Sequence, residues 1–252
     1  MTLCRALSTA CALALLTALA ACSGDDEGDG GTLTVLAAAS LTDVYEELGS
    51  TFEDEQGVEV EFSFGSSTDL AEQAADGAPG DVLSTADETS MQIAEDAGVT
   101  GEVVTFATNV LVIVTPPDNP AGIETLDDLD DATWVRCSDD VPCGRIALGV
   151  LEANAISAEP ASLEEDVRAT LDKVVSGEAE AGLVYASDAV AAGDDVMTID
   201  IPGAEEQLTS YFAAPLEGAE DAEDADLAQA WLDLLASEAG QQALTDAGFG
   251  LP

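Results

Sequence analysis

Apolar and polar residues follow two different periods along this chain. Short apolar or alternating runs, which indicate strands, lie between longer segments in which apolar residues return every three or four positions, which indicate helices. In the N-terminal half the predicted strands are 33–37, 58–64 and 81–84, and the predicted helices are 41–55 and 68–76. Strands that alternate with helices predict a parallel sheet with helices on its faces.

A second alternating region follows and completes the prediction of an α/β protein. Its predicted strands are 110–114, 133–136, 181–185, 196–199 and 208–213, and its predicted helices are 142–153, 166–176, 187–192 and 226–247. The chain passes between the two regions near Asn109 and Tyr211, which predicts a hinge between a lobe 1 (32–107 plus 214–252) and a lobe 2 (108–213). Ligands of such proteins bind between the lobes, where strands end and helices begin.

The N-terminus predicts export. Arg5 is the only charged residue of the first 21, and the uncharged run 6–21 is shorter than the ~20 residues of a membrane span, so we interpret 1–21 as a signal peptide. Small residues precede Cys22, a pattern similar to the bacterial lipobox, in which the cysteine carries lipid. An incidental cysteine is the alternative, but the polar segment 22–31 suits the flexible tether of a lipid-anchored, extracytoplasmic domain.

The charge of the chain is extreme. It contains 52 acidic and 5 basic residues, with a formal net charge of −47. Nucleic acid is excluded as a partner, because its phosphates are neutralised by Lys and Arg. Four basic residues follow the leader, namely Arg136, Arg145, Arg168 and Lys173. We interpret them as helix-surface partners of the abundant carboxylates, and a second possibility is that they offset the acidic field beside the cleft.

Cys137 and Cys143 are the cysteines that remain after the leader and the lipid site. Two cysteines at this short spacing in an exported chain predict a disulfide that closes a small loop. A metal site would need more soft ligands, and the chain contains no histidine.

Several predicted helices begin with small, hydroxylated or glycine-rich segments: 38–42, 64–68, 141–145 and 165–168. A helix N-terminus presents free N–H groups and a partial positive charge, so it binds anions without a basic side chain. Ser and Thr are also ordinary N-caps, and one such segment alone carries little weight. Their distribution over both predicted lobes favours an anion site in the cleft.

These segments resemble the periplasmic molybdate-binding proteins. The similar segments are 36–43, 62–67 and 77–82 for the first lobe, 141–145, 165–168 and 182–189 for the second, and 240–242 and 247–249 at the C-terminal end. They occur in the same order and at similar spacing, and together they cover nearly everything after the tether.

The resemblance implies a type II-like two-lobed periplasmic-binding-protein fold, in which each lobe is a mainly parallel sheet flanked by helices. It implies a monomeric transport protein, not an enzyme, that needs no cofactor and delivers its ligand, molybdate or tungstate, to the permease of an ABC importer. The implied oxyanion ligands are Ser40 and Ser67 through hydroxyl and backbone N–H, Cys143 and Val167 through backbone N–H, and Tyr185 through its phenol. Alanine is common in the family where Cys143 stands, but a backbone donor survives that change.

Three alternatives remain open at this point. A relative that binds another tetrahedral oxyanion, such as sulfate or phosphate, would share the fold. A secreted hydrolase would need a base, and the chain has neither histidine nor a Gly-x-Ser-x-Gly motif, which leaves only paired carboxylates. A calcium- or iron-binding surface protein would need a ligand cluster that the sequence does not display.

Overall fold

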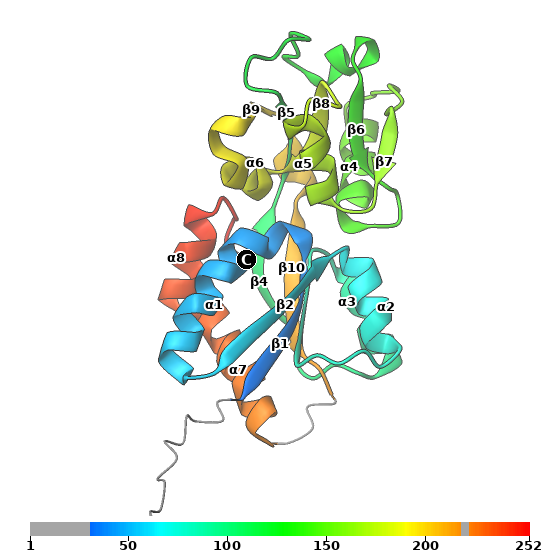
Figure 1. Cartoon of the computed structure of the whole chain (residues 1–252). Coiled ribbons are helices and arrows are strands. Elements are labelled where there is room, and N and C mark those ends of the chain that lie inside the picture. The colour runs from blue at the N-terminus through cyan, green and yellow to red at the C-terminus, as the bar shows by residue number, and fades with distance from the viewer. Residues whose placement is uncertain (1–30, 218–221) are drawn as a thin grey trace, which may run out of the picture.

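The computed structural model describes residues 31–217 and 222–252. The predicted signal peptide, Cys22 and nearly all of the tether lie outside the described residues. The described chain forms two lobes, one above the other in Figure 1, and each contains a five-stranded sheet with helices on its faces. No helix of the described part is long and apolar enough to cross a membrane.

The lower lobe in Figure 1 contains the N-terminal half and the C-terminal end of the described chain. Its strands, in the sheet order β2-β1-β3-β10-β4, are β2 (Glu59–Gly65), β1 (Thr32–Ala38), β3 (Val82–Thr85), β10 (Thr209–Pro215) and β4 (Val104–Asn109). Its helices are η1 (Ala39–Leu41), α1 (Thr42–Gln56), α2 (Ser67–Ala75), α3 (Glu88–Ala97), α7 (Ala222–Ala236) and α8 (Glu238–Asp246). Only β10 runs antiparallel to its neighbours, so the sheet is mainly parallel.

Alternation along β1 explains why this sheet is covered on both faces. Leu33 and Val35 pack with residues of α1, α7 and α8, whereas Leu36 packs with residues of α2 and α3. Trp231 of α7 lies at the centre of the first cluster, with its ring centroid 5.2 Å from that of Tyr45. Burial of this kind on both faces is what a parallel sheet requires.

The upper lobe repeats the plan. Its strands, in the sheet order β7-β6-β8-β5-β9, are β7 (Ser162–Glu164), β6 (Trp134–Cys137), β8 (Ala181–Tyr185), β5 (Leu111–Thr115) and β9 (Met197–Asp200). Its helices are η2 (Leu126–Asp131), α4 (Pro142–Ala153), α5 (Val167–Val175), α6 (Ala186–Ala192), η3 (Gly193–Asp195) and η4 (Ala204–Gln207). Here β5 is the antiparallel strand, and Trp134, Ile113 and Leu183 lie in one buried core.

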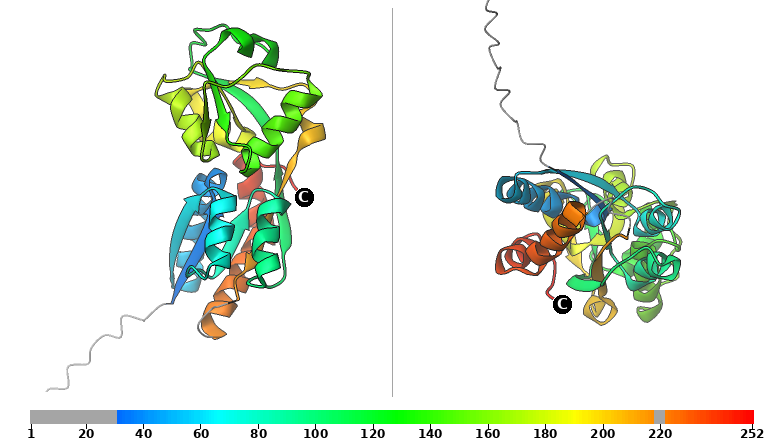
Figure 2. Two further views of the ribbon diagram at one scale, coloured as in Figure 1. Left: turned by 90° about the vertical axis from the view of Figure 1, so that its right-hand side faces the viewer. Right: turned by 90° about the horizontal axis from the view of Figure 1, so that it is seen from below.

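Two neighbouring segments connect the lobes. The chain leaves the lower sheet after β4 and returns to it at the start of β10, where Thr209 pairs with Asn109. Figure 2 shows the narrow waist that these segments form, with the C-terminus beside it. The predicted lobe 2 spans 108–213, but 108–109 and 209–213 pair in the lower sheet, because β4 ends at Asn109 and β10 begins at Thr209.

The secondary structure also differs from the sequence-based elements at α3, β4, β7 and the C-terminal helical segment. The helix α3 and the short strands β4 and β7 were not predicted, because none of them has a long periodic pattern. The predicted helix 226–247 is wrong as a single element, since it divides into α7 and α8 at Ser237. The Ser237 hydroxyl accepts the Gly240 N–H at 3.0 Å and begins α8, and a Cβ at Gly240 would lie 2.1 Å from the Leu234 carbonyl oxygen.

Candidate anion-binding site

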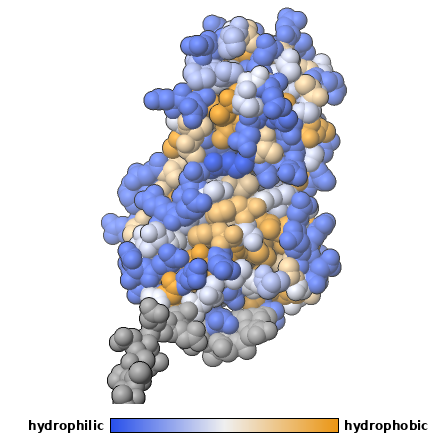
Figure 3. All heavy atoms as spheres, viewed as in Figure 1, coloured by the Kyte–Doolittle hydropathy of each residue, from blue (hydrophilic) through white to orange (hydrophobic). Residues whose placement is uncertain are grey.

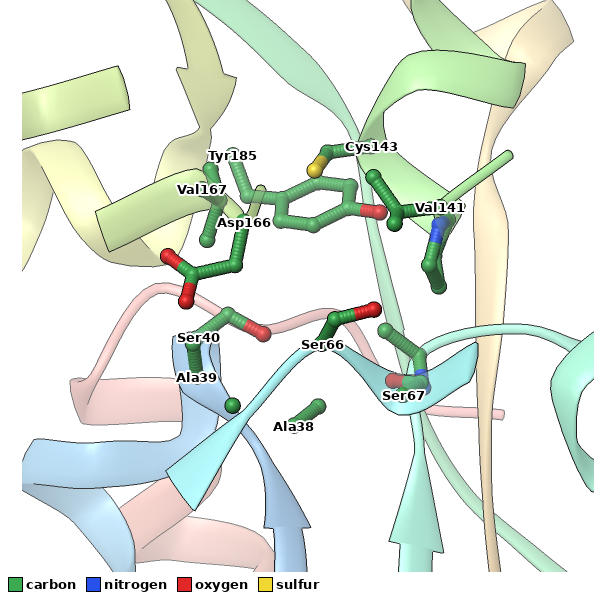
Figure 4. A pocket seen from close by; sticks show the side chains of 13 residues that line it. Ala38, Ala39, Ser40, Ser66, Ser67, Val141, Cys143, Asp166, Val167 and Tyr185 are labelled. Carbon is green, nitrogen blue, oxygen red and sulfur yellow. The ribbon is translucent and has the colours of Figure 1, made fainter. Parts of the chain in front are cut away.

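A small cavity of about 20 Å³ lies between the two lobes. The five residues predicted to bind an oxyanion all line it: Ser40, Ser67, Cys143, Val167 and Tyr185. In Figure 4 the serines lie below the cavity, on the lower lobe, and Cys143, Val167 and Tyr185 lie above it. The structure therefore brings together residues that are up to 145 positions apart (185 − 40) in the sequence.

Four short backbone segments around this cavity are the starts of helices. Ser40 lies in η1, Ser67 is the first residue of α2, Cys143 is the second residue of α4, and Val167 is the first residue of α5. N–H groups in the first turn of a helix have no acceptor inside that helix, and the helix dipole gives them a partial positive charge. Two such termini from each lobe can therefore donate to one anion between them.

The phenol of Tyr185 is the most informative side chain of the site. The residue is 1% exposed, and its Oη has no hydrogen-bond partner among the described residues. Burial raises the pKa of this phenol well above its ordinary value, so the group keeps its proton and can donate. A buried hydroxyl without a partner costs about 1–3 kcal/mol, and an anion acceptor in the cavity would remove that cost.

The hydroxyl oxygens of the two serines each have a hydrogen-bond partner in the lower lobe. The Ser67 Oγ accepts the N–H of Ala86 at 3.0 Å. The Ser40 Oγ lies 2.7 Å from the Oη of Tyr211, and burial raises the pKa of that phenol, which can therefore donate to Ser40. A hydroxyl whose oxygen already accepts a hydrogen bond can turn its own proton toward the cavity.

Sequence reasoning missed three residues of the site. Ser66 and Asp166 line the cavity, and both also cap a helix: Ser66 accepts from Asp69 N–H, and Asp166 Oδ1 accepts from Ala169 N–H at 2.9 Å. Serine and aspartate are preferred at the N-cap, and a Ser or Asp at the start of each predicted helix is the signal that could have identified them. Tyr211 had no such signal, because its role depends on contact with Ser40 from a distant strand.

No basic side chain lines the cavity, and the four cations of the described residues each pair with a carboxylate. Lys173 pairs with Glu178 at 2.6 Å on the surface of the upper lobe, as the sequence suggested. Arg145 and Arg168 depart from that interpretation, because each reaches a carboxylate of the lower lobe. Arg136 departs from it too, since its side chain is buried beside Cys137.

A disulfide joins Cys137, at the end of β6, to Cys143 in the first turn of α4, with 5.7 Å between the two Cα atoms. The loop that it closes is tightly packed. A Cβ on Gly144 would lie 1.7 Å from the carbonyl oxygen of Ser138, so only glycine fits there. The disulfide and Gly144 together constrain the loop that leads to Cys143, one of the residues that line the cavity.

We expect Gly144→Ala to lower the free energy of unfolding by about 1–3 kcal/mol, because the loop must move to relieve the contact with Ser138. Gly149→Ala is the control on the same helix, because its Cβ would meet only the flexible end of Gln207. Denaturant unfolding measures both variants. Equal stability of the two would show that the loop is not tightly packed.

Asp188 of α6 stands behind the tyrosine. Its Oδ2 accepts the backbone N–H of Tyr185 at 3.2 Å, and its Oδ1 lies 2.9 Å from the Nε of Arg168. Burial raises the pKa of the Asp188 carboxyl to about 7, against the opposing effect of Arg168. The carboxyl thus orients the strand end that carries Tyr185 and binds a proton more readily in the folded protein than in the unfolded chain.

A carboxyl whose pKa is raised by folding stabilises the protein below its unfolded pKa, and this contribution is lost as the pH rises through the folded value. We therefore expect the free energy of unfolding to fall less between about pH 5 and pH 8 in Asp188→Asn than in the unaltered protein. Denaturant unfolding across that range gives the two slopes. An identical slope would mean that Asp188 is ionised in the folded protein throughout.

The described residues contain no group of three or more His, Cys, Asp or Glu side chains placed to hold a metal ion. The cavity is lined by the N–H groups of the helix starts and the hydroxyls of Ser40, Ser67 and Tyr185, beside the Asp166 carboxyl that caps α5. Such a donor set suits an anion with several oxygens.

Comparison with known proteins gives one family and several relatives. The sequence model of the family described as bacterial extracellular solute-binding protein matches residues 33–250. The molybdate-binding protein ModA of Mycobacterium tuberculosis is 35% identical over 225 residues, which cover 88% of this chain and 85% of that protein. The Bacillus subtilis protein YvgL, which is named as an ABC transporter substrate-binding lipoprotein, is 28% identical over 169 residues, 63% of this chain and 64% of that one.

A solved structure has the same fold. The periplasmic molybdate-binding protein of Azotobacter vinelandii superimposes with a TM-score of 0.77 at 22% identity, over 87% of this chain and 99% of that one. The prediction of two α/β lobes of the periplasmic-binding-protein type is confirmed by this match and by the two mainly parallel sheets.

Proposed function

Because the chain belongs to the bacterial extracellular solute-binding protein family, we propose that it captures molybdate outside the cytoplasmic membrane and delivers it to an ABC importer. Membership of this family makes it a binding protein and not an enzyme. The observation that carries the proposal is the unpartnered phenol of Tyr185 in a cavity lined by helix N-termini of both lobes. That cavity offers donors without a basic side chain.

Molybdate is a dianion with four oxygens at neutral pH, and each oxygen can accept several hydrogen bonds. Hydrogen bonds to a charged acceptor contribute roughly 1.5–3 kcal/mol each. We assign the donors to the N–H groups of Ser40, Ser67, Cys143 and Val167, the hydroxyls of the two serines, and the phenol of Tyr185. Because both lobes contribute, the complete set is assembled only when the lobes are closed.

Tungstate has nearly the same size and charge as molybdate and should bind in the same way. Sulfate has shorter bonds, so its oxygens would reach fewer of the fixed donors, and a buried donor that loses its acceptor costs free energy. This difference is the physical basis for selectivity among tetrahedral oxyanions on one fold.

We expect calorimetric titration to show binding of molybdate and tungstate and much weaker binding of sulfate and phosphate. Molybdate or tungstate at about 100 times its Kd should raise the free energy of unfolding by ~2.7 kcal/mol. Tyr185→Phe should weaken molybdate binding about 10- to 100-fold, because one charge-assisted hydrogen bond is lost.

Tyr45→Phe is the matched control for that variant. Its hydroxyl bonds Ser84 at 2.9 Å inside the lower lobe and does not line the cavity, so its loss should leave the anion affinity unchanged. Equal affinity for all four anions would contradict the assigned ligand. Unchanged affinity in Tyr185→Phe would contradict the assigned donor.

We infer that the exported protein is held at the membrane by lipid on Cys22. The small residues before Cys22 and the polar tether 22–31 support this anchor, and a relative is named as a lipoprotein. The tether reaches the described domain at Gly31, just before β1.

Cys22→Ala should release the protein from the membrane fraction of bacterial cells that export it, because the lipid has no other attachment point. Fractionation followed by immunoblotting makes the measurement. Cys11→Ala is the control, since Cys11 lies inside the predicted signal peptide. A Cys22→Ala protein that stays with the membrane would contradict the lipid anchor.

A further inference from the structure

Two arginines of the upper lobe cross the cleft and pair with carboxylates of the lower lobe. Arg145 Nε lies 2.7 Å from Asp87 Oδ2, and Arg168 pairs with Asp43 of α1. Here these two pairs are called the latches. In each latch the arginine lies close in sequence to an upper-lobe donor, Arg145 two residues after Cys143 and Arg168 one residue after Val167.

The lower-lobe partners also lie beside donors. Asp87 follows Ala86, whose N–H bonds the hydroxyl oxygen of Ser67. Asp43 lies three residues after Ser40, in the first turn of α1. Each latch therefore connects one upper donor segment to one lower donor segment. Neither arginine lines the cavity itself.

The Arg145 latch makes the larger number of contacts. Besides the ion pair, Nη2 donates to Ser90 Oγ at 2.9 Å and lies 3.3 Å from Thr68 Oγ1, and Nη1 donates to the carbonyl oxygen of Asp140. The side chains of Arg145 and Asp87 are only 26% and 13% exposed. Shielding from water strengthens a charge pair, and a guanidinium in a fixed fork loses little freedom when it bonds several acceptors.

The second carboxylate oxygen shows how Asp87 is held in place. Its Oδ1 caps α3 by accepting the N–H of Ser90 at 2.9 Å, which leaves Oδ2 for Arg145. The ion pair of Arg168 with Asp43 of the lower lobe is weaker than that of Arg145 with Asp87, because the Asp43 side chain is 56% exposed and water screens its charge. On the upper side Arg168 also meets the buried Asp188.

The composition of the chain gives these contacts their importance. With a formal net charge of −47, closure brings two acidic bodies together. Of the four cations in the described residues, Arg136 and Lys173 pair within the upper lobe, and Arg145 and Arg168 are the two that pair across the cleft. These two ion pairs supply attraction between the acidic lobes at two points beside the anion site.

We propose that Arg145 and Arg168 are positioning residues that hold the lobes closed, with Arg145 dominant, and so set the residence time of the bound anion without touching it. The kinetic part of this proposal rests on the function proposed above. The structural part, the balance between open and closed lobes, does not depend on the identity of the ligand.

The test compares Arg145→Gln with Asp87→Asn and with the double variant. Asparagine at position 87 keeps a side-chain oxygen for the helix cap and removes the charge. We expect either single variant to raise the molybdate dissociation rate about 10- to 100-fold in a stopped-flow chase, because one charge-assisted contact is lost. The association rate should change little. The double variant should be no faster than Arg145→Gln, because both changes remove one interaction.

Lys173→Gln is the matched control, since it removes a positive charge whose partner Glu178 lies in the same lobe. It should dissociate like the unaltered protein. Arg145→Lys keeps the charge but loses the forked guanidinium, so its dissociation rate should lie between those of the unaltered protein and Arg145→Gln. Small-angle X-ray scattering without ligand should give a larger radius of gyration for Arg145→Gln than for Lys173→Gln.

Two results would overturn the proposal. One is a dissociation rate and a radius of gyration for Arg145→Gln that match those of Lys173→Gln. The other is slower association with unchanged dissociation, which would mean that Arg145 attracts the anion and does not hold the lobes. If molybdate binds to none of these proteins, the assigned ligand fails, and the scattering comparison still decides the latches.

Discussion

The structure depends on hydrogen-bond donors that cannot be satisfied inside their own elements. The helices that begin at Ser67, Pro142 and Val167 each leave N–H groups without an acceptor, and residues of all three starts line one cavity. The phenol of Tyr185 adds a further donor without a partner. Buried donors without acceptors cost free energy while the cavity is empty. A bound oxyanion would accept hydrogen bonds from both lobes and remove this cost, so binding favours the closed arrangement.

Donors of this kind, helix N-termini and hydroxyl groups, also explain how a strongly acidic protein can bind an anion. Long-range attraction is unavailable, so binding relies on short-range dipoles and hydrogen bonds in a cavity away from solvent. The scarce cations are used elsewhere: Arg145 and Arg168 join the lobes beside the cavity. Attraction between the lobes and attraction for the ligand are thus supplied by different groups, and each can be changed without removing the other.

Much of the fold follows from local patterns. The alternation in β2 and the apolar spacing of α1 are strong patterns, because each of these elements packs one face against the core, and β1 is recognised as a short apolar run that is buried on both faces. The elements that the pattern missed are short: β7 depends on its pairing with β6, and α3 depends on its packing against α2 and the sheet. The division of the C-terminal helix at Ser237 depends on one cap and one close approach, which a periodic pattern does not reveal.

By itself, the sequence determined where α1, α2, α4 and α5 begin to within one residue, and therefore which N–H groups around the cavity lack an acceptor, because capping residues act within three or four positions. It also indicated the pairing of Cys137 with Cys143, which are close along the chain. Only the tertiary structure decided which distant residues contact the segments around the cavity. The Tyr211 phenol reaches Ser40 across 171 positions, and Arg145 reaches Asp87 across 58. Such contacts depend on how two lobes meet, and no local propensity encodes the relative placement of surfaces that are brought together only when both lobes have folded.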